Sequence, residues 1–181
     1  MRVGIFSGKL TKLHAEVLVV SCFEDVRPLR GFAGEVDWLY GGIFSNLLMQ
    51  GKVTGKLGEI LLLATQQKMQ VPKVILAGLG PSNVYEAADF GRIAKRIAGV
   101  MMGLQARECA MELLPPPSRS LDPVLLMESF LKGMEETKKL EPFDLTFIVK
   151  DGEKARALQQ RIKNGSYVWS QPYSLARSEN D

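Results

Sequence analysis

Apolar and polar positions along the chain follow two kinds of pattern. In residues 36–48 and 90–102, apolar side chains recur every three or four positions, which predicts two helices that each bury one face. Elsewhere lie short apolar runs that are mostly continuous, as expected of strands covered by helices on both faces of a sheet. These runs are residues 3–6, 17–23, 60–64, 74–77, 109–114 and 145–149.

Capping residues mark two more helices in the second half of the chain. Asp122 precedes Pro123, a capping residue followed by the proline that favours a first helical turn. Asp151 and Gly165 bracket a further helical segment, with the glycine as its stop signal. Strands that alternate with helices predict a three-layer α/β/α fold around a mixed, mainly parallel sheet. We expect one domain over residues 1–170 and a polar tail over residues 171–181.

A series of glycine-containing motifs runs through the first half of the chain. Residues 37–42 are Asp-Trp-Leu-Tyr-Gly-Gly, residues 55–59 are Gly-Lys-Leu-Gly-Glu, and residues 78–80 are Gly-Leu-Gly. In this order and at this spacing, the series resembles the N-terminal domain of the leucyl aminopeptidase family, peptidase family M17. The resemblance covers most of the chain and implies a macro-domain-like fold.

The resemblance does not extend to the segment that hydrolyses peptides. The family's hallmark Asn-Thr-Asp-Ala-Glu-Gly-Arg segment is absent, and the chain ends at Asp181, about where the family's metal-dependent peptidase domain would begin. The resemblance therefore implies a non-catalytic domain standing alone, with no catalytic residue, metal or cofactor of its own. His14 is the only histidine, and without clustered cysteines one chain cannot assemble a zinc site of nitrogen and sulfur ligands.

Two adjacent glycines interrupt the most periodic helical segment. Gly41 and Gly42 lie off the apolar stripe, and a helix running through both would lose roughly 2 kcal/mol relative to alanine. One interpretation is that a helix begins near Gly42, so that the bare amides of Ile43 and Phe44 hold an anion such as a phosphate. The other, which we favour, is that the glycines let a neighbouring element pack closely.

Two loops follow buried strands at the sheet edge where open α/β folds bind ligands. Gly78, Leu79, Gly80, Ser82 and Asn83 lie between a strand and a helix, where the glycines permit a tight turn and the polar side chains suit a helix cap or a phosphate. A single Gly-x-Gly is not a dinucleotide-binding fingerprint, so a structural turn is the favoured interpretation.

The second loop follows the strand of residues 17–23. Cys22 ends an apolar run, and Glu24 with Asp25 forms an acidic pair that is able to do acid–base work or to lie solvated at the surface. Without a partner of known geometry, we favour the solvated loop. Together with Gly41–Ile43 and the 78–83 loop, these residues make up the predicted ligand site.

Composition narrows the classes of partner. A net charge of +3 with no dense block of Lys and Arg argues against nucleic acid. No apolar run approaches the ~20 residues of a membrane span, and the N-terminus lacks the apolar core of a signal peptide, so we expect a cytoplasmic protein without a membrane partner. Cys22 and Cys109 lie far apart in apolar surroundings, which favours two buried thiols.

Three classes of function remain open. The first is a binding or regulatory module for a small phosphate-containing ligand, such as ADP-ribose or another nucleotide derivative. The second is an interaction protein that forms a homo-oligomer or joins an aminopeptidase-like chain. The third is an enzyme, either a hydrolase that processes ADP-ribose or an aminopeptidase completed by a separate chain. The region of residues 21–25 lacks the asparagines found in hydrolytic macro domains, and the chain lacks the metal ligands of the peptidase.

Overall fold

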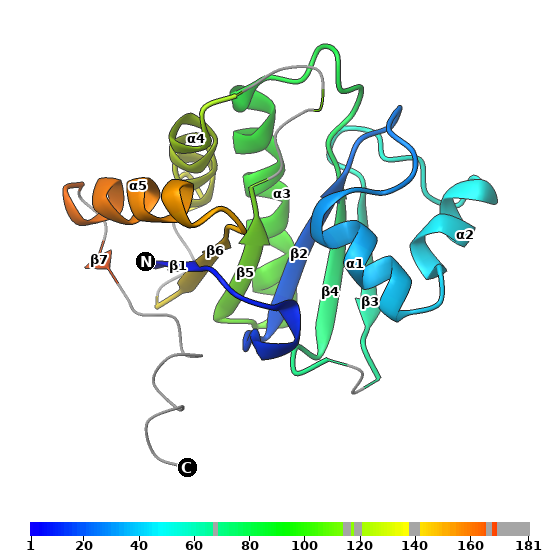
Figure 1. Ribbon diagram of the computed structural model, residues 1–181, viewed down its shortest axis with the longest axis horizontal. Helices are drawn as coiled ribbons and strands as arrows, with labels where there is room; N and C mark the ends of the chain where they lie inside the picture. The colour runs from blue at the N-terminus through cyan, green and yellow to red at the C-terminus, as the bar shows by residue number, and fades with distance from the viewer. Residues whose placement is uncertain (67–68, 114–116, 118–120, 138–141, 166–167, 170–181) are drawn as a thin grey trace.

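A seven-stranded sheet forms the centre of the molecule (Figure 1). The computed structural model describes residues 1–66, 69–113, 117, 121–137, 142–165 and 168–169, so the predicted tail lies outside the described residues. The strand order is β3-β4-β2-β5-β6-β1-β7. Only β3 runs antiparallel to its neighbour, while the other pairings are parallel. The strands are β1 (Arg2–Phe6), β2 (Val17–Cys22), β3 (Ile60–Ala64), β4 (Lys73–Gly78), β5 (Glu108–Glu112), β6 (Asp144–Ile148) and β7 (Val168–Trp169).

Helices cover both faces of this sheet and confirm the predicted three layers. Alternate strand residues, such as Val17 and Val19 of β2, pack against α3 (Ala87–Leu104), α4 (Pro123–Glu135) and α5 (Gly152–Lys163). The opposite face, with Leu18 and Val20, packs against α1 (Gly31–Leu39), α2 (Ile43–Met49) and the short 3-10 helix η1 (Leu10–Lys12). Figure 1 shows α1 in front of the sheet and α3 behind it. Burial on both faces explains why the strand sequences are continuously apolar.

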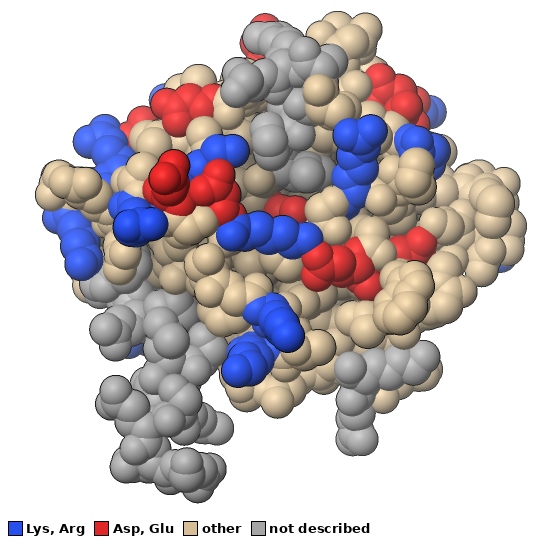
Figure 2. All heavy atoms as spheres, viewed as in Figure 1, with Lys and Arg blue, Asp and Glu red and all other residues tan. Residues whose placement is uncertain are grey.

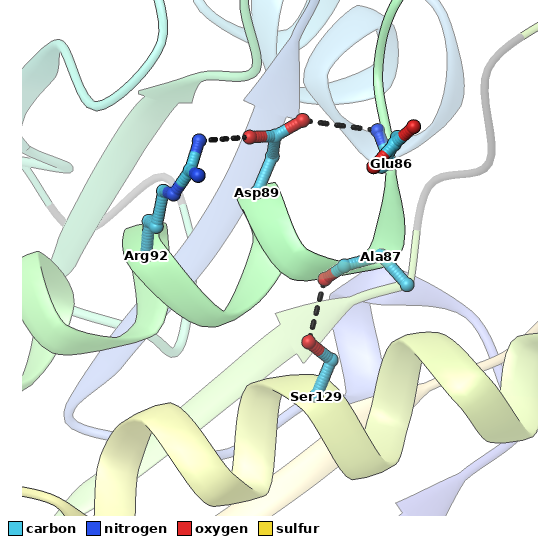
Figure 3. Close-up of polar contacts among 5 residues, drawn as sticks. All are labelled: Glu86, Ala87, Asp89, Arg92 and Ser129. Carbon is cyan, nitrogen blue, oxygen red and sulfur yellow. Dashed lines mark hydrogen bonds and ion pairs between the residues drawn. The ribbon is translucent and has the colours of Figure 1, made fainter.

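Capping positions the two helices that pack most closely on one another (Figure 3). The carboxylate of Asp89 accepts a hydrogen bond from the backbone amide of Glu86 (3.0 Å), which forms one half of a capping box. Its other oxygen accepts from Arg92 at 2.8 Å. From α4, the Ser129 hydroxyl donates to the carbonyl oxygen of Ala87 (2.6 Å), which ties the second helix to the first turn of α3. The end of α3 nearest the loop after β4 is thereby fixed.

The segment at 36–48 departs from the prediction of one continuous stripe. It forms the end of α1 and the whole of α2, separated by a turn in which Gly41 and Gly42 have positive φ angles of 67° and 80°. These angles lie in the left-handed region that glycine adopts without strain. The favoured interpretation, close packing of a neighbouring element, is wrong, because a Cβ atom at Gly41 would meet nothing within 4 Å and one at Gly42 only the Asn46 side chain at 4.0 Å. The predicted caps are confirmed, since Asp122 accepts from the Val124 amide (2.9 Å) and Asp151 from the Glu153 amide (2.9 Å).

Candidate functional site

The loops after β2 and β4 do lie together, as the shared sheet edge predicts. The Leu79 amide donates to the carbonyl oxygen of Cys22 (2.8 Å), and the Glu24 amide donates to the carbonyl oxygen of Gly80 (2.9 Å). These bonds continue the parallel pairing of β2 with β4 past the ends of the two strands. Two of the three predicted segments are therefore neighbours, and their backbone groups are bonded to one another.

The Asp25 side chain, in the loop after β2, is hydrogen-bonded to the loop after β4. Asp25 accepts hydrogen bonds from the Ser82 amide (2.8 Å) and from the Ser82 hydroxyl (3.0 Å). The Ser82 amide lowers the pKa of Asp25 below its ordinary value. Asn83 is exposed beside it. Asp25 and Ser82 therefore join two loops, which is a structural role for the pair.

The amides of the Gly-Leu-Gly turn are all engaged within the chain. The Gly78 amide donates to the Glu59 carbonyl oxygen (2.8 Å) and the Gly80 amide to the Gly55 carbonyl oxygen (2.9 Å), while Leu79 is bonded to β2 as described. A Cβ atom at Gly78 would lie 2.7 Å from the Gly55 carbonyl carbon. Close approach of the 55–59 loop accounts for this glycine, and the three amides are not available to cradle a phosphate.

The helix α2, which starts at the third predicted segment (Gly41, Gly42 and Ile43), is capped by a carboxylate of the same chain. The Asp37 carboxylate, only 8% exposed, accepts from the backbone amides of Phe44 (2.7 Å) and Ser45 (3.1 Å) at the start of α2. The expectation that the Phe44 amide is bare is thus corrected, because an internal carboxylate caps the helix instead. Figure 1 places α2 beside β3, at the edge of the sheet.

A larger hollow lies at the carboxyl ends of β1 and β6, against α1. This hollow, which we call the α1 crevice, has a volume of about 890 Å³. Residues 7–11 after β1, Lys150 after β6, and residues at the start and along α1 line it, among them Gly31, Phe32, Glu35 and Trp38. The Trp38 side chain is 79% exposed. None of the predicted site residues lines this crevice, although Trp38 and Leu39 of the 37–42 motif do.

A buried carboxylate lies at the N-terminus of α1. The Phe32 amide donates to both carboxylate oxygens of Glu112, at 3.0 Å and 2.9 Å, and Glu112 is only 7% exposed. Gly31 has a positive φ of 62°, and a side chain there would overlap the Glu112 carboxylate. Burial raises the pKa of Glu112 to about 7, against the opposing effects of the Phe32 amide and of Lys150.

An ion pair crosses the crevice next to this carboxylate. Lys150, from the loop after β6, pairs with Glu35 on α1, and its ammonium lies 4.5 Å from the centroid of the Phe32 ring. The contact therefore joins the carboxyl end of the sheet to α1. Sequence inspection missed Glu112 because it lies inside the apolar run of residues 109–114, which was predicted as one strand, whereas the observed β5 ends at Glu112. A charged residue closing a buried strand is the signal that marks it.

A second, smaller hollow of about 220 Å³ lies beyond the end of β2, with Cys22 and Arg30 among its lining residues. Burial raises the pKa of the Cys22 thiol to about 11, with Arg27 acting in the opposite direction. Cys22 is therefore a protonated thiol at neutral pH, which is the unreactive form. Cys109 is also buried, and burial raises the pKa of its thiol as well.

Charges on the visible face of the molecule are mixed in sign. Figure 2 shows Lys and Arg interspersed with Asp and Glu on the face that carries α1, without a block of one sign. Within the described ranges, no group of three or more His, Cys, Asp and Glu side chains is placed to hold a metal ion. Likewise, no described helix has the length and apolar character that crossing a membrane requires.

A sequence profile of the cytosol aminopeptidase family, N-terminal domain, matches residues 19–125. The chain belongs to this family. A relative is the probable cytosol aminopeptidase of Idiomarina loihiensis, which is 32% identical over 96 residues. That alignment covers 53% of this chain and 19% of the relative, so the chain corresponds to a small N-terminal part of the curated proteins it matches. Only the N-terminal domain of the family is matched, and not its catalytic domain.

Solved structures show the same fold in aminopeptidases and in macrodomains. A tomato leucine aminopeptidase mutant aligns with a TM-score of 0.68 at 16% identity, over 88% of this chain and 35% of that one. The Trypanosoma brucei macrodomain, solved in complex with ADP, aligns with a TM-score of 0.67 at 13% identity, over 89% of this chain and 69% of that one. The fold of this family member is therefore macrodomain-like, as the resemblance implied.

Proposed function

We propose that this domain is a non-catalytic binding module whose ligand site is the α1 crevice. The ligand that suits the crevice is a small molecule with a planar, largely apolar group, of which adenosine is the representative. The observation that carries the proposal is the exposed Trp38 side chain on the wall of a hollow at the carboxyl ends of β1 and β6.

Position and size both support a ligand in this crevice. Open α/β sheets bind ligands outside the carboxyl ends of their strands. The volume of about 890 Å³ falls in the range of small-molecule sites. An indole that is 79% exposed presents a flat face on which a base can stack, a contact that contributes about 1–3 kcal/mol. The macrodomain that shares this fold was solved with ADP, a ligand that contains adenosine.

The absence of catalysis is part of the same proposal. The family profile stops short of the peptidase domain, and the Cys22 thiol, which lines the smaller hollow, is held in its protonated form. Of the acidic residues in the predicted site, Asp25 is bonded to the Ser82 amide, and the nearby Asp37 is bonded to the Phe44 amide. These two carboxylates therefore have structural roles.

Isothermal titration calorimetry with adenosine tests this proposal. The wild-type chain is expected to bind adenosine saturably, and Trp38→Ala is expected to weaken binding at least ten-fold, because it removes the stacking surface. Met49→Ala is the matched control, since Met49 is a 77% exposed apolar side chain on α2, outside the crevice. Equal binding by the wild type and Trp38→Ala would exclude the crevice as the binding site. No heat of binding with the wild type would exclude adenosine-like molecules as the ligand class.

A second candidate function is association with another chain. The edge strand β3 is apolar throughout, and its Leu62 side chain is 44% exposed. Exposed apolar edges favour pairing with a further strand. A homo-oligomer, or a complex with a catalytic aminopeptidase-like chain, would cover this edge. Size-exclusion chromatography with light scattering, alone and with such a chain, tests it, and Leu62→Lys is expected to abolish the association. An unchanged monomeric mass in both experiments would exclude this candidate.

A further inference from the structure

We propose that Glu112 determines the ligand class of the α1 crevice, because its carboxylate occupies the position at the N-terminus of α1 that a ligand phosphate would take. The crevice is thereby suited to an adenosine-like ligand without a diphosphate. This inference rests on the function proposed above and narrows it, since it separates nucleosides from nucleoside diphosphates such as ADP-ribose.

The first step is the contact between Glu112 and α1. The first amides of a helix have no partner within the helix, and the helix dipole makes this end favourable for an anion. In α1 the Phe32 amide donates to both oxygens of Glu112, at 3.0 Å and 2.9 Å. The anion at this helix end is therefore supplied by β5 of the same chain.

The second step is that this helix end forms part of the crevice wall. Gly31 and Phe32 both line the crevice, so a ligand lying against α1 meets the residues that hold Glu112. Gly31 has no side chain, and a Cβ atom there would overlap the carboxylate, so glycine is what allows Glu112 to approach. A phosphate directed at the Phe32 amide would meet the volume of Glu112 and, above the Glu112 pKa of about 7, its negative charge.

The third step is that the adjacent cation does not compensate for a phosphate. Lys150 lies over the Phe32 ring and is paired with Glu35, so its charge is already balanced beside the helix end. Lys9 also lines the crevice, so its charged lining consists of Lys9, Lys150 and Glu35, while Glu112 lies buried behind Gly31 and Phe32. At the helix end itself, a diphosphate would compete with the Glu112 carboxylate for the Phe32 amide, so a neutral ligand group is the one that fits there.

The test compares adenosine, ADP-ribose and inorganic pyrophosphate by isothermal titration calorimetry with the full chain. The variants are Glu112→Gln, which removes the charge and keeps the shape, and Glu112→Ala, which also opens space. The wild type is expected to bind adenosine at least ten-fold more tightly than ADP-ribose. Both variants are expected to reduce the ratio of the two affinities, adenosine over ADP-ribose, at least ten-fold. Glu108→Gln is the matched control, because Glu108 lies on the same strand at its opposite end. It is expected to leave the ratio unchanged.

The outcomes separate the two proposals. If adenosine binds but the ratio is the same in wild type and both Glu112 variants, the role of Glu112 is overturned while the binding module stands. If adenosine and ADP-ribose bind to none of the proteins, the proposed function fails, and the titration with pyrophosphate then tests the role of Glu112. Tighter binding of pyrophosphate by Glu112→Ala than by the wild type would support the role of Glu112, and equal binding would overturn it. Thermal unfolding of each variant establishes that it is folded.

Discussion

Replacing Glu112 by glutamine should change how the stability of this domain depends on pH. The pKa of Glu112 is raised from 4.5 in an unperturbed carboxyl to about 7 in the folded chain, chiefly by burial. The folded state therefore holds this proton more tightly than the unfolded state, and the free energy of unfolding falls as the pH rises from about 4.5 to about 7. At about 1.4 kcal/mol per pH unit, the loss amounts to about 3 kcal/mol.

Glutamine carries no charge and keeps an oxygen that accepts from the Phe32 amide. The Glu112→Gln variant should therefore lack this component, while every other titrating group is common to both proteins. The difference in unfolding free energy between variant and wild type should grow in favour of the variant by about 3 kcal/mol between pH 4.5 and pH 8. Urea unfolding followed by circular dichroism at several pH values measures this difference directly.

The control is Glu153→Gln, which makes the same change of charge on the exposed side of α5. Its difference from the wild type should stay nearly constant over the same pH range. A constant difference for Glu112→Gln as well would refute the reasoning, because burial would then impose no penalty on the Glu112 carboxylate.

Two further substitutions test packing and capping by the same unfolding measurement. Gly133→Ala would bring a Cβ atom to 2.8 Å from the Ala94 side chain between α3 and α4, and should destabilise the domain by about 1–3 kcal/mol. Gly99→Ala, in open space on α3, should instead stabilise it by about 1 kcal/mol, and equal stabilities would contradict the packing argument. Asp37→Ala should cost about 1–3 kcal/mol by removing the buried cap of α2, and Asp37→Asn should recover part of the loss. Wild-type stability in Asp37→Ala would show that the cap contributes nothing.

Local features of the fold were predictable from the sequence because neighbouring residues encode them. Continuous apolar runs located six of the seven strands, and Asp122 and Asp151 located the starts of two helices. The two-residue strand β7 is too short to leave a pattern. The split between α1 and α2 was harder to predict, because the apolar stripe continues across it while Gly41 and Gly42 turn the chain.

The candidate site was less predictable because it depends on which segments meet. The strand pattern placed two loops at one sheet edge, and they do lie together, through Leu79 and Cys22. The Gly-Leu-Gly motif gave no sign that the amides of that turn are already bonded, since the partner of Gly80, Gly55, comes from another loop. Glu112 stands 80 positions from Phe32, and no pattern of neighbouring residues relates the two.

By itself, the sequence determined the alternation of strands and helices, the capped helix ends and the family, since these rest on local periodicity and on motifs in a fixed order. The tertiary structure alone decided where the crevice lies and which carboxylate caps the helix that forms its wall. Parallel strands are joined by long crossover connections, so Glu112 at the end of β5 reaches the start of α1 only once the strands have taken their order in the sheet. The position of the Glu112 carboxylate, which we expect to select the ligand, thus follows from the strand order and not from any sequence motif.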